Sequence, residues 1–183
     1  TNGTLTLAAA GTHGGAFLVN TGTTLSFANT TTNSQITGAT FTNNGTVSVG
    51  TGRYVVFSGS AAQTLSGNGS FASLAVNNPA HLSIPGAQTL TNLNLLNGNI
   101  LLGNSDLVVP NIAGGGASSF VATTGTGRLQ SGTTTTAKLF HIGPSATQYN
   151  PVTLRNVSLT STFAVRVQVG LDNPIGAPAK VDR

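Results

Sequence analysis

Short runs in which apolar and small polar residues alternate recur along most of the chain, and this period of two limits the folds it can adopt. The clearest runs are residues 4–7, 24–27, 46–49, 73–76 and 163–167. Because successive side chains of a strand point to opposite faces, such runs predict strands with one buried face. No stretch keeps apolar residues at the spacing of an amphipathic helix. The sequence therefore predicts an all-β protein.

Glycine turns stand before, or close before, the first four of these runs. The glycines are Gly3, Gly22, Gly45 and Gly69, which makes their spacing similar but not constant. We expect positive φ angles there, because glycine adopts them at little cost. A repeat of about 20 residues that holds two or three short strands is typical of one coil of a β-solenoid. A β-sandwich of hairpins is the alternative, but long spacers such as residues 28–35 suit tight hairpins less well.

The character of the sequence changes after three consecutive glycines, Gly114 to Gly116, and we place a boundary near residue 125. Residues 1–125 are expected to form a parallel β-helix or β-solenoid. Residues 126–183 are expected to form a short β-rich cap or a partial β-sandwich. In the solenoid, inward aliphatic and aromatic side chains would stack from coil to coil, with rows of Thr and Ser outside and Asn ladders at the corners.

Charged residues make up only 5% of the chain, so its surface must be neutral and polar. The isoelectric point near 10.4 reflects three Asp and no Glu against seven scattered Lys and Arg. Nucleic-acid recognition draws on several converging cations, and no such cluster is visible. No apolar run is long enough for a membrane-spanning helix. We expect neither nucleic-acid binding nor membrane insertion.

Carboxylates, which most hydrolytic mechanisms on polysaccharides need in pairs, are scarce. The chain has Asp106, Asp172 and Asp182, and no two of them are close in sequence except in the Pro-containing tail. Asp106 is expected to cap its own turn, residues 103–106. The sequence also lacks a nucleophile elbow, a P-loop and a dinucleotide-binding motif. We therefore predict no catalytic residue and no cofactor, and the chain is not expected to be an enzyme.

The histidines and tyrosines are the remaining candidates for a site. His13, His81 and His141 are far apart and have no partner at the spacing of metal ligands, so no metal site is predicted. Tyr54 and Tyr149 could stack on sugar rings, although scattered aromatic residues usually serve packing. Phe57 could stack in the same way, and we take the two tyrosines as the possible glycan contacts.

Three segments resemble a family of large surface and secreted proteins of Bacteroidetes. Residues 62–69 (AQTLSGNG), followed by 74–78 (LAVNN), are similar to the family's QTLSGSG…NLTINN unit. Residues 140–156 are similar to its FPIG…YxPVTLxN segment, with His141 at the usual proline position, and residues 93–102 resemble the stretch between the two. The resemblance implies export by the type IX secretion system and a role as an adhesin-like stalk or matrix protein.

Composition, periodicity and this resemblance together favour a non-catalytic structural or adhesive module at the cell surface or outside the cell. It would act as a rigid stalk, a matrix component or a filament building block, cut from a longer protein. Its open ends would pair with flanking repeats or with another copy. The alternative is a carbohydrate-binding module on an extracellular polysaccharide-processing protein. Ice binding is a third hypothesis, which the uneven coil intervals disfavour.

Overall fold

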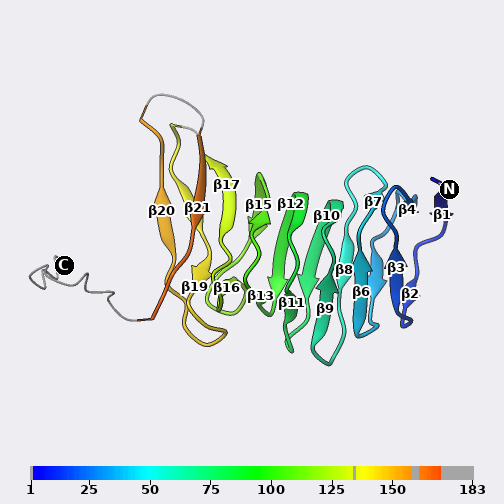
Figure 1. The fold of residues 1–183 in the computed structure, drawn as a ribbon, viewed down its shortest axis with the longest axis horizontal. Coiled ribbons are helices and arrows are strands. Elements are labelled where there is room, and N and C mark those ends of the chain that lie inside the picture. The colour runs from blue at the N-terminus through cyan, green and yellow to red at the C-terminus, as the bar shows by residue number, and fades with distance from the viewer. Residues whose placement is uncertain (1, 134, 158–160, 170–183) are drawn as a thin grey trace, which may run out of the picture.

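The protein is a stack of β-strand coils, and the computed structural model describes residues 2–133, 135–157 and 161–169. Strands are the only regular elements in these residues, and most pair in parallel with strands one coil earlier and one coil later (Figure 1). The predicted all-β fold and parallel β-solenoid are therefore confirmed. Each coil has three faces. In the coils whose strands are separate, each face contains one strand.

The first face starts each coil. Its inward side chains at positions 5, 25, 47, 71 and 90 are in register from coil to coil. The number of residues between successive positions is therefore the length of each coil. Strands of this face are, in order along the solenoid, β1 (Thr4–Leu7), β4 (Thr24–Phe27), β7 (Thr46–Val49), β10 (Ser70–Asn77), β12 (Gln88–Asn97), β14 (Leu107–Val108) and β17 (Leu129–Thr133).

The second face follows in the same coils. Its separate strands are β2 (Thr12–His13), β5 (Ser34–Ile36), β8 (Val55–Phe57) and β15 (Asn111–Gly114). Between β8 and β15, this face is formed by the second halves of β10 and β12, which pair in register with β8 and β15. In these two coils the first and second faces are thus one continuous strand.

The third face forms a separate 7-stranded parallel sheet, with one strand from each coil, so the solenoid has about seven coils. Its strands are β3 (Phe17–Val19), β6 (Thr40–Asn43), β9 (Gln63–Ser66), β11 (Leu82–Ile84), β13 (Ile100–Leu102), β16 (Val121–Thr123) and β19 (Ile142–Gly143).

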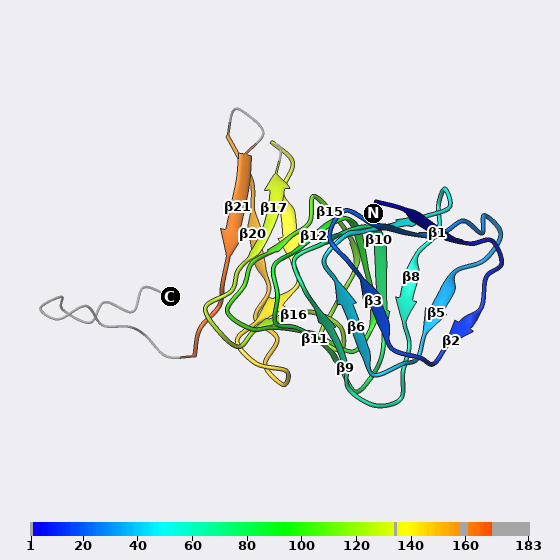
Figure 2. The same cartoon turned by 45° about the vertical axis from the view of Figure 1, so that its right-hand side comes forward.

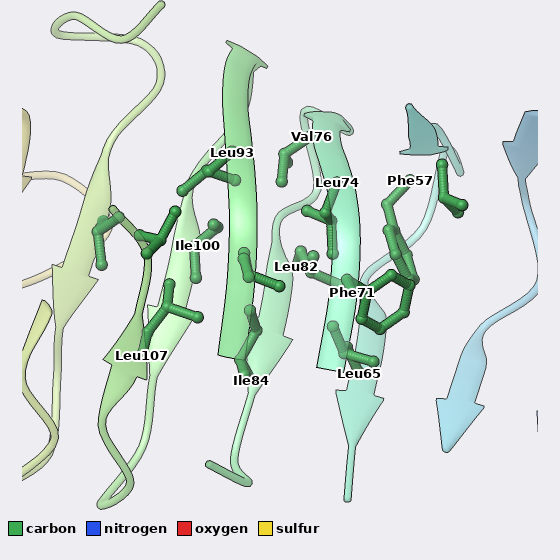
Figure 3. Packing of buried hydrophobic residues seen from close by; sticks show 14 of the residues in the cluster. Phe57, Leu65, Phe71, Leu74, Val76, Leu82, Ile84, Leu93, Ile100 and Leu107 are labelled. Atoms are coloured by element: carbon green, nitrogen blue, oxygen red, sulfur yellow. The ribbon is translucent and has the colours of Figure 1, made fainter. Parts of the chain in front are cut away.

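One hydrophobic core fills the space between the three faces along the stack, and Figure 3 shows part of it, between Phe57 and Leu107. Its N-terminal part is aromatic: the ring centroid of Phe41 lies 5.0 Å from that of Phe17, 5.4 Å from Phe71 and 5.9 Å from Phe57. Further along, the core is mainly aliphatic, and the ring of Phe140 belongs to it near the C-terminal end of the stack. Each fully buried side chain of this kind contributes about 1.5–3 kcal/mol to stability.

Buried amides hold the corners together. Gln63 is 1% exposed; its Nε2 donates to the carbonyl oxygens of Ile36 (2.9 Å) and Gly38 (2.8 Å). Its Oε1 accepts from the Gly59 amide (3.0 Å) and from Asn78 Nδ2 (3.0 Å). The Asn78 and Gln63 side chains therefore satisfy backbone groups that leave the sheets at the corners, as buried polar groups require. Side chains of Asn33, Asn44, Asn68 and Asn104 accept from backbone amides one coil later, which confirms the expected corner ladders.

The turn glycines serve close approach between coils more than unusual backbone angles. Of the four turn glycines, only Gly22 has a positive φ, so the expectation for the other three was wrong. A Cβ on Gly45 would lie 2.4 Å from the Thr23 carbonyl oxygen, and one on Gly69 would lie 2.5 Å from the Gly45 carbonyl oxygen. Glycine is required there because the preceding coil occupies the space of a side chain.

The C-terminal end has antiparallel strands. β21 (Ser161–Val165) pairs antiparallel with β17, and β20 (Val152–Leu154) pairs antiparallel with β18 (Lys138–Phe140). Figure 2 shows β17, β20 and β21 together at this end of the stack. The expected boundary near residue 125 precedes β17, but the hydrophobic core continues past it through Leu129, Phe140 and Ile142. The described part of residues 126–183 thus completes the last coil and adds a β-rich cap.

Candidate functional site

A groove of about 220 Å³ on the second face contains Tyr54, the first of the two predicted glycan contacts. Tyr54 directly precedes β8, and its backbone amide donates to Asn33 Oδ1 (2.9 Å), which fixes the start of that strand. Its ring is half-buried. The remaining lining comes from β12, the segment around β15, and Lys138 of β18.

The groove carries a row of amide side chains on neighbouring coils. Asn92 is in register with Asn111, and both lie on outward positions of the second face. Asn92 Nδ2 donates to Ser73 Oγ (3.0 Å), and Asn111 Nδ2 donates to the Thr91 carbonyl oxygen (3.2 Å). Since the amide nitrogens are used within the solenoid, the Oδ1 atoms are the groups left to accept from a hydroxyl-bearing ligand.

Lys138 closes one end of this groove but is occupied by the fold. Its Nζ donates to the Pro110 carbonyl oxygen (2.8 Å) and to Ser131 Oγ (2.5 Å), and lies 5.8 Å from the Phe140 ring centroid. Burial lowers the pKa of this ammonium group. Lys138 therefore ties β18 to the preceding coil and is not a free cation for an anionic ligand.

Tyr149, the second predicted glycan contact, is a packing residue. Its hydroxyl lies 2.6 Å from His141 Nδ1, and its ring centroid is 5.3 Å from that of Phe120. His141 and Tyr149 stack with an interplanar angle of 11°, and burial lowers the pKa of His141. Tyr149 does not line the groove that holds Tyr54, so the structure does not bring the two tyrosines together.

Asp106 forms an ion pair with Arg128, one coil later. Arg128 donates to it from the backbone amide (2.8 Å), Nε (3.2 Å) and Nη2 (2.8 Å), and Gln130 Nε2 donates from 2.5 Å. The expectation that Asp106 caps its own turn was wrong, because these donors belong to the next coil. The hydrogen bond from the Arg128 side chain is the main cause of the lowered pKa of Asp106. Asp172 and Asp182 lie outside the described residues.

This pKa shift predicts how acid affects stability. Since the folded-state pKa of Asp106 is below its ordinary value of 3.8, the stability it contributes is present at higher pH and is lost as pH falls below 3.8. We expect the urea midpoint to fall in this range in the wild type, and the fall to be smaller in Asp106→Asn. The midpoint of each protein at neutral pH serves as its reference. Equal acid sensitivity of both proteins would contradict the prediction.

The other histidines serve the fold. His13 lies at an inward position, with its ring centroid 5.7 Å from those of Phe17 and Phe27. His81 adopts a positive φ of 77°, and its Nδ1 accepts from the Asn99 amide (3.3 Å). Among residues 2–133, 135–157 and 161–169, no three His or Asp side chains gather as a metal site would require. The same residues include no helix that could cross a membrane.

Comparison of the chain with protein-family models, with curated proteins and with solved structures found no match.

Proposed function

We propose that the chain is a non-catalytic structural or adhesive module of a larger extracellular or cell-surface protein, in which it acts as a rigid stalk or matrix element. The observation that carries this proposal is the continuity of the core. One hydrophobic cluster runs from Val19 to Val165 through every coil. A stack without an internal break in its core bends and extends little, which suits a spacer that must hold an attached domain at a fixed distance.

Side-chain bonds between coils support the same function. The Asp106–Arg128 pair, the Gln63 network and the Asn ladders all connect residues roughly one coil apart. A pulling force along the stack would therefore have to break the backbone hydrogen bonds between coils and these side-chain bonds together. The low content of charged residues, 5% of the chain, adds an advantage for a stalk, since it limits the long-range field that would attract unrelated charged molecules.

The resemblance to surface proteins of Bacteroidetes supports the extracellular location. The segment 62–69 covers β9 and its following turn, and the segment 140–156 covers β19 and β20. Export by the type IX system would place the module on the cell surface. We expect brief protease treatment of intact producing cells to release peptides of this chain. Recovery of the protein only from the cytosol would overturn the proposed location.

A screen of the purified chain against plant, algal and bacterial polysaccharides tests the non-catalytic part of the proposal. The expected result is no release of reducing ends above that of a heat-denatured control. Turnover that is lost in a single-residue variant would overturn the proposal and identify the catalytic group.

Glycan binding at the Tyr54 groove is the second candidate function, and the aromatic ring beside the two asparagine side chains favours it. Sugars offer an apolar C–H face to aromatic rings and hydroxyl donors to amide oxygens. An uncharged polysaccharide strand lying across the coils would meet both.

The expected effect of Tyr54→Ala is loss of glycan-array binding by about fivefold or more, because each lost stacking contact is worth roughly 1 kcal/mol or more. Tyr149→Phe is the matched control: it removes a hydroxyl from the packed Tyr149–His141 pair and should leave binding unchanged. A blank array with the wild-type chain would remove this candidate, and equal losses in both variants would show that the groove is not the binding site.

A further inference from the structure

A shallow depression of about 570 Å³ lies at the corner between the third and the first face and shares no lining residue with the Tyr54 groove. Its lining comes from the turns that precede β12, β14 and β17 and from the residue that follows β21. Three successive coils and the antiparallel cap therefore contribute to it. We call it the corner depression, and its polar and charged lining residues are Asn104, Ser105, Asp106, Thr126, Arg128 and Arg166.

The cap brings the two arginines of the corner depression together. β17 and β21 pair antiparallel, with Leu129 opposite Val165 (Figure 2). Both of these side chains are buried, so the next residue on each strand faces outward. Extension of the register by one residue places Arg128 opposite Arg166, and both line the depression. Like charges at directly opposite positions are destabilising, so this pair of guanidinium groups requires a nearby anion.

The protein supplies one carboxylate for these two cations. Asp106 is the only Asp or Glu among residues 2–133, 135–157 and 161–169. Its oxygens accept from Nε and Nη2 of Arg128. In the same part of the chain no ion pair joins it to Arg166, because the Asp106–Arg128 pair is the only salt bridge. Two positive charges thus face one negative charge, and one positive charge is left over.

The Arg128 guanidinium retains one free edge. The group has five N–H donors in a planar fork, and Asp106 takes the Nε hydrogen and one Nη2 hydrogen. Within the described residues, no group accepts a hydrogen bond from Nη1 of Arg128. The Arg128 side chain is 52% exposed. Its remaining edge, formed by Nη1 and Nη2, therefore has the geometry to bind a second, planar carboxylate through two parallel hydrogen bonds.

The rest of the lining favours a sugar as the carrier of that carboxylate. The hydroxyl groups of Ser105 and Thr126 can donate to and accept from sugar hydroxyls. Ala87 is the only apolar lining residue, so the side chains of an acidic peptide would find little surface to pack on. Nucleic acids are recognised by several converging cations, and only two converge here.

We infer that the corner depression binds a uronate residue of an acidic polysaccharide, with the uronate carboxylate between Arg128 and Arg166. The carboxylate accepts from the free edge of Arg128 and from Arg166, and it supplies the negative charge that Asp106 alone does not. This inference rests on the adhesive part of the proposed function and names a ligand class for it. The depression runs along several coils, so a polysaccharide strand can cross it without entering a closed cavity.

Isothermal titration calorimetry with polygalacturonate in calcium-free buffer tests the inference. The methyl ester of polygalacturonate has the same sugar chain without the charges, and it should bind about tenfold more weakly or worse, because charge-assisted hydrogen bonds are lost. Polyglutamate presents carboxylates on a peptide and should also bind more weakly than polygalacturonate. Tyr54→Ala should leave polygalacturonate binding unchanged, which separates the corner depression from the Tyr54 groove.

Variants of the charged residues test the geometry. Arg166→Gln should weaken binding of polygalacturonate by about tenfold or more. Arg155→Gln is the matched control: it changes the net charge equally, but Arg155 follows β20 and does not line the depression, so binding should be unchanged. Asp106→Asn should strengthen binding by about threefold or more, because it removes the negative charge that competes for Arg128. Circular dichroism at neutral pH verifies that each variant is folded.

Several results would overturn the inference. These are equal binding of polygalacturonate and its methyl ester, equal losses in Arg166→Gln and Arg155→Gln, and weaker binding by Asp106→Asn. Tighter binding of polyglutamate, or no binding of polygalacturonate at all, would overturn it as well. Absence of binding would leave the stalk function standing, since that function is tested by cell-surface exposure and by the polysaccharide screen.

Discussion

Replacement of Phe41 with alanine is expected to lower the free energy of unfolding by about 3–5 kcal/mol, the usual loss for a fully buried phenylalanine. Phe41 is completely buried on β6 and contacts rings from three other strands, Phe17, Phe57 and Phe71. These rings come from three different coils and from all three faces. Removal of the central one leaves a cavity that the stack cannot close, because each neighbour is held by its own backbone ladder.

Urea unfolding followed by circular dichroism measures this effect. Leu96→Ala is the control, since Leu96 is half-exposed and its truncation should change stability by less than about 0.5 kcal/mol. A Phe41→Ala loss as small as that of the control would show that the aromatic cluster is not packed as described. The loss should appear as a lower midpoint with an unchanged slope, provided that the whole stack unfolds as one unit.

Gln63→Leu is the second substitution with a large expected effect, although leucine is apolar and similar in size. The variant leaves the Gly38 carbonyl oxygen and the Gly59 amide buried without their present partner, whereas the Ile36 carbonyl oxygen keeps its bond from the Ser58 amide (2.9 Å). Each unsatisfied buried group costs about 1–3 kcal/mol, so we expect a total loss on the order of 3–5 kcal/mol after partial relaxation. Thermal or urea denaturation measures it.

Gln35→Leu is the matched control for this variant. Gln35 lies at the half-exposed middle position of β5, between the buried Ser34 and Ile36. A change within about 0.5 kcal/mol is expected there, because no buried partner loses a hydrogen bond. Similar losses in the two variants would mean that replacement of glutamine by leucine destabilises these strands in general and that the Gln63 network contributes nothing specific.

The period of two was sufficient to predict the first three strands of the first face, because the inward positions of β1, β4 and β7 are all apolar. The runs at residues 4–7, 24–27 and 46–49 coincide with β1, β4 and β7. The run at 163–167 was placed slightly late, since β21 ends at Val165 and the Val167 amide donates to Thr123 Oγ1 instead (3.1 Å). The joining of two faces into single strands in β10 and β12 had no clear local signal, because it depends on the neighbouring coils.

Buried amides were not predictable from local pattern. Asn was expected at the corners and no role was predicted for Gln, yet Asn43, Gln63, Asn78 and Gln88 are all fully buried. What buries them is the stacking of corners that lie one coil apart in the sequence. Spacing equal to one coil length is the signal that could have found such contacts. It also applies to Asp106 and Arg128, whose side chains pair across two successive coils.

The candidate site was predicted only in part. Tyr54 was named from its residue type, but its groove depends on Asn92 and Asn111, which reach it from the two neighbouring strands β12 and β15. Tyr149 could not be distinguished from Tyr54 by sequence, since its partners Phe120 and His141 come from different coils. Stacking of coils therefore decided which tyrosine packs and which faces a groove.

The parallel pairing of strands between successive coils also affects how such a protein can evolve. Successive coils pair through parallel strands, so the gain or loss of one whole coil rejoins parallel edges and preserves the frame of inward residues. Each event alters the reach of the rod by about 4.8 Å, the distance between neighbouring strands. Loss of half a coil would instead turn apolar side chains outward. Selection on reach thus acts through a set of fixed increments.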